Sequence, residues 1–211
     1  PRLKEIYEVI LSTFNDDGTP DAAPMGIRFL TRRSVQVRFY QGSRTLRNVL
    51  ERGCAVANLT CDANLFYRTA FKEKGGLPRS YFSRPPHVDA PLLRSADGYI
   101  ELMLRRIGRV RHGVLAEFRV GGIHRKDEAP IIYSRGPHAL IEATIHATRI
   151  REFLNDKRRV EEVKRLTQLI NHYKGVIERV CPDSEYEKAI RELRSRIRGW
   201  KSVQSTCEDT F

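Results

Sequence analysis

Apolar residues follow two different spacings along this chain, and the change between them limits the folds that it can adopt. Through most of residues 1–124, short runs alternate apolar and polar side chains and are separated by turn signals, as is typical of half-buried strands. From Gly136 the apolar residues recur at steps of three and four, which predicts helices. No strand–helix alternation of a parallel sheet is present, so we expect an antiparallel barrel of about six strands followed by helices.

Residues 41–48 form the clearest candidate binding segment. They follow a predicted strand and begin a predicted helix, for which Ser43 is a suitable N-cap and Gly53 a suitable C-cap. The first turn of this helix also carries Arg44 and Thr45, so free N–H groups, hydroxyls and a guanidinium lie together. We interpret the segment as a phosphate-binding site. The alternative is that Ser43 only caps the helix and that the arginines are solvated.

The predicted strand at residues 22–30 has one face that is poor in side chains. The face expected to meet the core carries Met25, Ile27 and Phe29. The opposite face carries Pro24, Gly26 and Arg28. Such a strip lets a flat ligand approach the backbone, although a glycine at this position is equally compatible with a β-bulge.

Three further polar residues are candidates for a binding role. Asn58 lies in an otherwise apolar predicted strand, and a buried asparagine needs partners that either backbone groups or a heterocycle can supply. His146 shares a predicted helical face with Glu142 and Arg149. It could act as a proton shuttle, contact a cofactor or form a surface ion pair with Glu142.

The charge and the motif content exclude several classes of protein. The net charge of +12 is spread along the chain, so a dedicated nucleic-acid surface is not expected, while phosphate-bearing cofactors and acidic substrates suit such a chain. The four cysteines form no CxxC pair, and no spacing typical of metal ligands is present, so no metal site is expected. Neither GxGxxG nor GxxxxGK[ST] occurs, which excludes dinucleotide-binding and P-loop sites of those types.

The length of the chain allows a barrel domain with an extension. We expect the barrel in residues 1–134 and a helical extension, packed on the barrel, in residues 135–204. No apolar run is long enough to cross a bilayer, and the first residues do not resemble a signal peptide. A cytoplasmic protein without membrane contacts is therefore expected.

Three segments together resemble the flavin-reductase-like split-barrel superfamily: residues 17–26, 42–49 and 56–62. The predicted helix at residues 142–149 is similar to a second characteristic stretch of a largely archaeal branch of this superfamily, which is catalogued as a domain of unknown function. Leu46 stands where an aromatic residue is expected in that branch. The resemblance implies an α+β, mainly β fold: a split β-barrel of the FMN-binding type with a C-terminal helical segment.

The same resemblance implies a homodimer that binds FMN near its interface. It implies phosphate contacts from Ser43, Arg44, Thr45 and Asn48. It implies that Pro24, Met25, Gly26, Ile27 and Arg28 line the isoalloxazine ring, that Asn58 approaches the ribityl chain or the ring, and that His146 and Arg149 are further cofactor residues. The activity implied is of the oxidoreductase type, with NADH or NADPH as possible electron donors and no catalytic residue assigned. The alternatives are an FMN carrier or sensor without turnover, and a basic nucleic-acid-binding barrel without flavin.

Overall fold

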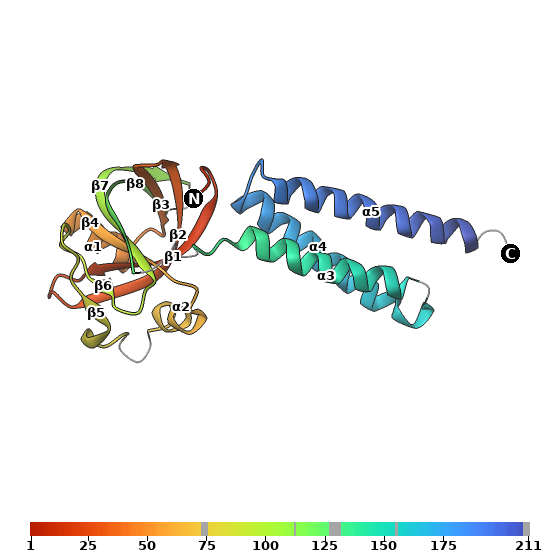
Figure 1. Ribbon diagram of the computed structural model, residues 1–211, viewed down its shortest axis with the longest axis horizontal. Coiled ribbons are helices and arrows are strands. Elements are labelled where there is room, and N and C mark those ends of the chain that lie inside the picture. Colours follow the sequence, from red (N-terminus) through yellow and green to blue (C-terminus); the bar gives the residue numbers. More distant parts are fainter. Residues whose placement is uncertain (73–75, 112, 127–131, 155, 209–211) are drawn as a thin grey trace. The chain divides into compact units, whose positions relative to one another are not determined.

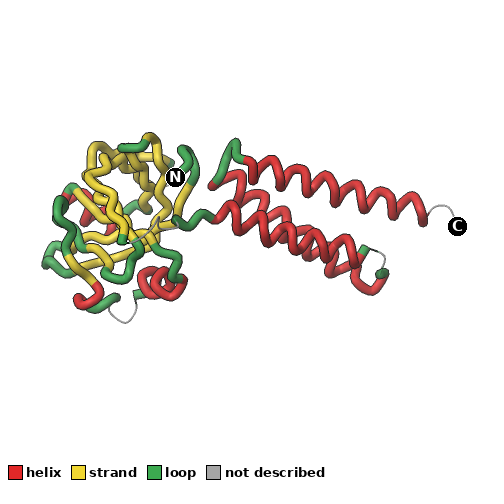
Figure 2. The backbone as a smooth tube through the Cα atoms, viewed as in Figure 1, coloured by secondary structure: helices red, strands yellow, loops and turns green. Residues whose placement is uncertain are grey.

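The contacts within the chain divide it into two units, Pro1–Tyr133 and Ser134–Phe211. The computed structural model describes residues 1–72, 76–111, 113–126, 132–154 and 156–208. Figure 1 shows that the first unit is built mainly from strands and the second from helices, and Figure 2 shows the same division by type of structure.

The described part of the first unit contains a closed antiparallel barrel with the strand order β1-β2-β3-β8-β7-β4. These strands are β1 (Ile6–Phe14), β2 (Pro20–Thr31), β3 (Ser34–Phe39), β4 (Cys54–Leu59), β7 (Gly98–Val110) and β8 (Gly113–Arg125). A short ladder between β1 and β4, from Ile10 opposite Asn58 to Ser12 opposite Val56, closes the barrel. The prediction of about six antiparallel strands is confirmed.

Alternate side chains of the barrel strands point inwards and form one apolar core. Ile27 and Phe29 are almost completely buried in it, and Met25 packs against it, as the sequence predicts. The rings of Phe39 and Phe118 meet inside the barrel with their centroids 6.4 Å apart. The residues that alternate with Met25, Ile27 and Phe29 therefore lie on the outer face of β2.

Helix α1 (Arg44–Arg52) follows β3 and has the two predicted caps. The Oγ atom of Ser43 accepts a hydrogen bond from the N–H of Leu46. At the other end, Gly53 has a φ of 66°, and its N–H donates to the carbonyl oxygen of Val49. Glycine adopts this left-handed conformation without steric cost, so the helix ends where the sequence predicts.

The β7–β8 hairpin differs from the prediction. The sequence predicts a strand end at Gly108 and a bend at Gly121, but both residues lie inside continuous strands. Gly121 is the additional residue of a bulge that faces Glu101 and Leu102 on β7. An antiparallel ladder accommodates one extra residue in this way, and the bulge changes the direction of the neighbouring side chains.

The segment between β4 and β7 contains more regular structure than the sequence predicts. Helix α2 (Ala63–Ala70) begins after Asp62, whose carboxylate accepts hydrogen bonds from the N–H groups of Asn64 and Leu65. Residues 72–97 were expected to form a loop without regular elements. They contain the 3-10 turn η1 (Arg79–Tyr81) and the paired two-residue strands β5 (Phe82–Ser83) and β6 (Leu92–Leu93), while residues 73–75 lie outside the described part of the chain.

The second unit consists of α3 (Arg135–Phe153), the short turn η2 (Lys157–Arg159), α4 (Val160–Val180) and α5 (Glu185–Glu208). Helix α3 packs against both α4 and α5. The buried residues of α3 recur at three- and four-residue steps, namely Gly136, Ala139, Ala143, Ala147 and Ile150. Among the described helices, none is both long and apolar enough to span a bilayer. The packing of this unit on the barrel stays a prediction.

The backbone at Gly113 provides a test of the barrel geometry. Gly113 has a φ of 130°, and a Cβ atom at this position would overlap the carbonyl oxygen of Phe39. We expect Gly113→Ala to lower the free energy of unfolding by about 3 kcal/mol, because the backbone and Phe39 must both shift. Gly108→Ala in the partner strand is the matched control, since a Cβ there meets no atom within 4 Å. Urea denaturation of both variants measures the difference, and an equal loss in the two would contradict the prediction.

Candidate functional site

A cavity of about 410 Å³ lies where the β1–β2 turn, the start of α1 and the end of α2 meet. Its charged lining residues are Arg44, Arg68, Lys72, Arg79 and Asp21. Four cationic side chains thus surround the cavity against one carboxylate. Because a cleft lined by charges of one sign raises the local concentration of ions of the other sign, this cavity favours an anionic ligand.

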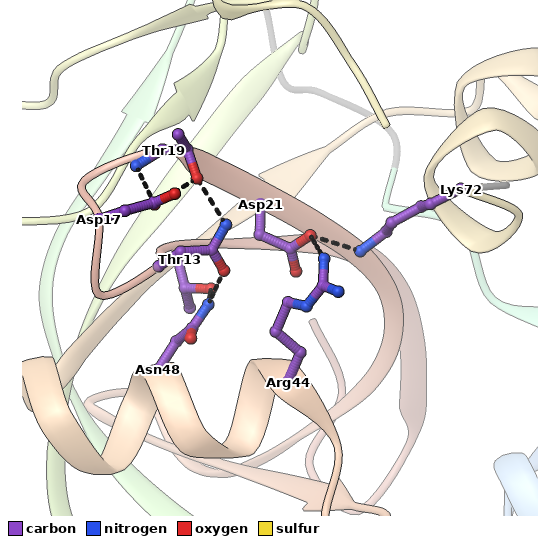
Figure 3. Close-up of polar contacts among 8 residues, drawn as sticks. Thr13, Asp17, Thr19, Asp21, Arg44, Asn48 and Lys72 are labelled. Atoms are coloured by element: carbon purple, nitrogen blue, oxygen red, sulfur yellow. Dashed lines mark hydrogen bonds and ion pairs between the residues drawn. The ribbon is translucent and has the colours of Figure 1, made fainter. Parts of the chain in front are cut away.

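Asp21 is the only carboxylate among these lining residues, and it holds two of the cations (Figure 3). It is 5% exposed, and its Oδ1 atom lies 2.7 Å from Nζ of Lys72 and 3.9 Å from Nη1 of Arg44. Its Oδ2 atom is buried without a hydrogen-bond partner. The side chain of Arg44 remains 64% exposed, so its guanidinium is also available to a ligand in the cavity.

Arg68 is positioned by an aromatic side chain from the following segment. Its Nη1 atom donates a hydrogen bond of 2.9 Å to the hydroxyl of Tyr81. Its guanidinium carbon also lies 4.8 Å from the centroid of the Tyr81 ring, within the range of a cation–π contact. These two contacts restrict the guanidinium and reduce the entropy that it would lose on binding an anion.

The β1–β2 turn beside the cavity is held by hydrogen bonds from its own side chains. The Oδ1 atom of Asp17 accepts bonds of 2.6 Å from the hydroxyl of Thr19 and 2.9 Å from the N–H of the same residue. The hydroxyl bond makes the largest contribution to lowering the pKa of Asp17. Thr19 in turn accepts a bond of 2.8 Å from the amide of Asn15. The turn therefore keeps its shape at the edge of the cavity.

Asn48 of α1 connects the helix to this turn (Figure 3). Its side chain is 2% exposed, and its Nδ2 atom donates bonds of 2.9 Å to Oγ1 of Thr13 and to Oδ1 of Asn15. Both amide hydrogens are used, so Asn48 fixes the helix against β1. Its predicted contact with a phosphate stays a prediction.

The other predicted phosphate residues occupy different environments. Arg44 lines the cavity, as expected of a ligand residue. Ser43 caps α1 through its hydroxyl, which is the alternative that the sequence left open, and Thr45 is buried in the first turn. The structure thus brings Arg44 to the cavity, whereas Ser43 caps α1 and Asn48 ties the helix to β1.

The outer face of β2 leads away from the cavity. Ala22 lines the cavity, and Pro24, Gly26 and Arg28 follow at two-residue steps on the same face. With the usual rise of a strand, Arg28 lies about 20 Å along β2 from Ala22. The Nε atom of Arg28 is buried and has no hydrogen-bond partner. The strip therefore ends at an unsatisfied donor.

The outer face of β2 at Pro24, Gly26 and Arg28 carries few side-chain atoms, as the sequence predicts. The side chain of Ile6 limits the space beside Gly26. A Cβ atom on Gly26 would lie 3.0 Å from Cγ2 of Ile6, so a larger residue would displace Ile6. The pairing of β2 with β3 begins at Ile27, which leaves Pro24 outside that ladder and removes the need for an N–H donor there.

Asn58 is completely buried and has protein partners for both ends of its amide. Its Nδ2 atom donates bonds of 2.8 Å to the carbonyl oxygen of Ile10 and to Oγ of Ser12. Its Oδ1 atom accepts a bond of 2.7 Å from the N–H of Leu93. Of the two explanations that the sequence left open, the structure supplies protein partners, and the contact of Asn58 with a cofactor stays a prediction.

His146 and Arg149 lie on α3, in the second unit. The ring of His146 lies 5.8 Å from that of Tyr173, and its Nδ1 atom is buried without a hydrogen-bond partner. Among the described contacts of the unit, no ion pair joins His146 to Glu142. Arg149 is exposed, and after the larger effect of Arg165 its charge contributes to lowering the pKa of Glu162. The cofactor roles of both residues stay predictions.

Arg79 belongs to residues 79–84, a segment for which the sequence leaves open contact with a ligand or packing on the barrel wall, and it lines the cavity. Arg68 and Lys72 are cavity residues that the sequence does not predict. Both depend on α2, which is not among the predicted elements. Asp62 followed by apolar Leu65 and Phe66 is the signal that could have revealed this helix, because it matches an N-cap and one apolar face.

The sequence matches the family described as a protein of unknown function (DUF447). The model of its N-terminal domain matches residues 7–130, and a second model of the same family matches residues 134–197. Among solved structures, the FMN-bound protein MM1853 from Methanosarcina mazei, which carries the same family model, is 27% identical to this chain. The match covers 91% of this chain and 95% of that one, with a TM-score of 0.53.

Two further solved structures are similar to a smaller part of the chain. The flavoredoxin of Desulfovibrio vulgaris is 16% identical, with 62% of this chain and 82% of that one covered and a TM-score of 0.51. The styrene monooxygenase flavin reductase of Pseudomonas putida is also 16% identical, with 59% and 83% covered and a TM-score of 0.51. The first unit thus has the split-barrel fold of flavin reductases, and the predicted resemblance is confirmed. The chain belongs to the DUF447 family.

Proposed function

We propose that this protein is an FMN-binding flavoprotein of the oxidoreductase type. The observation that carries the proposal is the cationic cavity at the start of α1, in a chain whose family includes an FMN-bound member. FMN joins a dianionic phosphate to a flat ring, so its site needs an anion pocket and a slot beside it. The cavity supplies the first requirement and the outer face of β2 supplies the second.

The residues of the cavity fit a phosphate group. Arg44 stands at the start of α1, where free N–H groups and the helix dipole also favour an anion. Arg68 and Arg79 add further positive charge to the lining of the cavity, while Asp21 keeps Lys72 in place. The proposal assigns the phosphate to Arg44, Arg68 and Arg79.

The strip on β2 fits the ring. Its small side chains leave the backbone accessible, and the unpartnered Nε atom of Arg28 supplies a donor for the edge of the ring that becomes negative on reduction. When bound, FMN supplies the electron-transfer chemistry. Arg28 would orient the ring and stabilise negative charge on it.

The proposal includes a homodimer with FMN near its interface. Large apolar side chains are exposed on the barrel unit, and Tyr40 is the most exposed of them at 81%. An interface that covers such residues removes apolar surface from water and also excludes water from a ring bound nearby.

The phosphate assignment predicts that FMN binds more tightly than riboflavin. We expect Arg44→Gln to weaken the binding of FMN by about tenfold or more, because a charged hydrogen bond is lost, and to leave the binding of riboflavin nearly unchanged. Arg109→Gln is the matched control, since Arg109 is exposed on β7 and does not line the cavity. Quenching of flavin fluorescence measures both affinities. Equal affinities for FMN and riboflavin would remove the phosphate site from the proposal.

The role of Arg28 predicts a change in redox behaviour. We expect Arg28→Met to make the midpoint potential of bound FMN more negative, because the reduced, anionic ring loses a donor. Arg149→Met tests the other arginine that the sequence suggested for this role. Anaerobic dye-coupled titration measures both potentials, and an unchanged potential in Arg28→Met would contradict the assignment.

Electron donors are tested in the same anaerobic cell. Bleaching of the visible flavin absorbance after addition of NADH or NADPH is expected of an oxidoreductase. Absorbance that persists with both nucleotides would instead favour the FMN carrier or sensor.

The dimer predicts a particle of twice the chain mass in solution. We expect multi-angle light scattering to give this mass for the FMN-loaded protein, because the exposed apolar residues are then covered. A monomeric mass for a protein that retains FMN would exclude the dimer and leave the flavin site intact.

A further inference from the structure

Beyond the flavin proposal, the barrel unit contains a second cluster of polar side chains, formed by His87, Glu101 and His124. Glu101 lies on the outer face of β7 and is completely buried. Its neighbours on β4 and in the covering segment are largely apolar, and they include Val56, Val88 and Ala90. A carboxylate buried in such surroundings is costly unless positive charge or hydrogen bonds compensate it.

Both oxygens of Glu101 are directed at histidines. The Oε1 atom accepts a hydrogen bond of 2.9 Å from the backbone N–H of His87. The Oε2 atom lies 2.8 Å from Nδ1 of His87 and 3.1 Å from Nε2 of His124. One oxygen and two ring nitrogens, from three separate segments of the chain, thus lie within 4.8 Å of one another.

The surrounding backbone is shaped to bring these atoms together. The bulge at Gly121 lies beside Glu101 on the neighbouring strand. Such a bulge changes the direction in which nearby side chains point, here that of Glu101. A Cβ atom on Gly122 would lie 2.7 Å from both Oε2 of Glu101 and Nε2 of His124, so glycine leaves the space that the cluster needs. The ring of His124 is also stacked on Tyr99, with centroids 4.5 Å apart and an interplanar angle of 15°.

We propose that His87, Glu101 and His124 form a binding site for a divalent transition-metal ion of the zinc class. Two imidazoles and one carboxylate, with a remaining position for water, are a ligand set that zinc takes in proteins. With metal–ligand distances of about 2.0–2.1 Å, neighbouring ligand atoms of a tetrahedral ion lie about 3.3 Å apart. To admit the ion, Oε2 of Glu101 needs to separate from each ring nitrogen by only a few tenths of an ångström. The two ring nitrogens, which lie within 4.8 Å of each other, need to settle about 3.3 Å apart.

The site is open to solvent on one side. The side chain of His87 is 59% exposed and that of His124 is 32% exposed, whereas Glu101 is not exposed. An ion can therefore enter past His87, and water can occupy the remaining position. Because His87 belongs to the segment between β5 and β6, the ion would fasten this segment to β7 and β8.

Zinc binding to the untagged protein, measured with and without added FMN, tests the proposal. After removal of metals with a chelator, the protein is dialysed against micromolar zinc chloride, and bound zinc is measured by mass spectrometry. Competition with a chromophoric chelator gives the affinity. We expect one zinc ion per chain, and at least about a 100-fold loss of affinity in His87→Ala and in His124→Ala, since even residues that only orient metal ligands contribute 10–100-fold.

His172→Ala is the matched control, because His172 is an exposed histidine of α4 outside the cluster. It is expected to bind zinc as the wild type does. His87→Ala removes a largely exposed side chain and is expected to fold, and Glu101→Gln keeps the shape of the buried residue. Zinc is expected to raise the melting temperature of the wild type and not that of His87→Ala.

Two outcomes overturn the proposal. One is bound zinc far below one ion per chain in the wild type. The other is an affinity that is the same in the wild type, His87→Ala and His124→Ala, which would locate the ion elsewhere. Both readouts are independent of flavin reduction, so the proposed function and the metal site can fail separately.

Discussion

Closure of the barrel between β1 and β4 is the constraint on which the rest of the structure depends. This ladder is short, and the buried amide of Asn58 reinforces it by bonding to Ile10 and to Ser12 across the two strands. A buried amide without these partners would cost about 1–3 kcal/mol, so the bonds specify the register as well as stabilise it. Since α1 connects β3 to β4, closing β4 on β1 also brings the start of α1 to the β1–β2 turn.

The cationic cavity follows from that placement. The first turn of α1 meets the turn that Asp17, Thr19 and Asn15 hold in shape, and Asn48 joins the two. Asp21 then keeps two cations close together that would otherwise repel each other. A dianion that entered the cavity would meet cations that are already positioned, so little ordering entropy would be lost on binding. A buried carboxylate in the cavity is therefore consistent with an anion site.

Local signals predicted the parts of this arrangement that depend on local structure. Ser43 and Gly53 define α1 because their capping roles require only neighbouring backbone groups. The alternation at Met25, Ile27 and Phe29 predicted the inner face of β2, since the strand period alone decides it. The role of Asn58 was left open because its partners lie more than 30 residues away along the chain. The cluster at Glu101 could not be predicted, because its two histidines lie 14 and 23 residues away from Glu101 along the chain.

The irregular segment between α2 and β7 explains why function can depend on residues that lie outside the barrel strands. Its backbone is tied to the barrel at Leu93, whose N–H is bonded to Asn58, and at His87, whose N–H is bonded to Glu101. The pair β5–β6 joins these points to Tyr81 and hence to the cavity, because Arg94 donates its N–H to the carbonyl oxygen of Tyr81. Because side chains of the barrel accept hydrogen bonds from the backbone N–H groups of His87 and Leu93, this part of the chain needs few helices or strands of its own to keep its position. Asn58, which helps to close the barrel, thus also holds the segment that brings Arg79 to the cationic cavity.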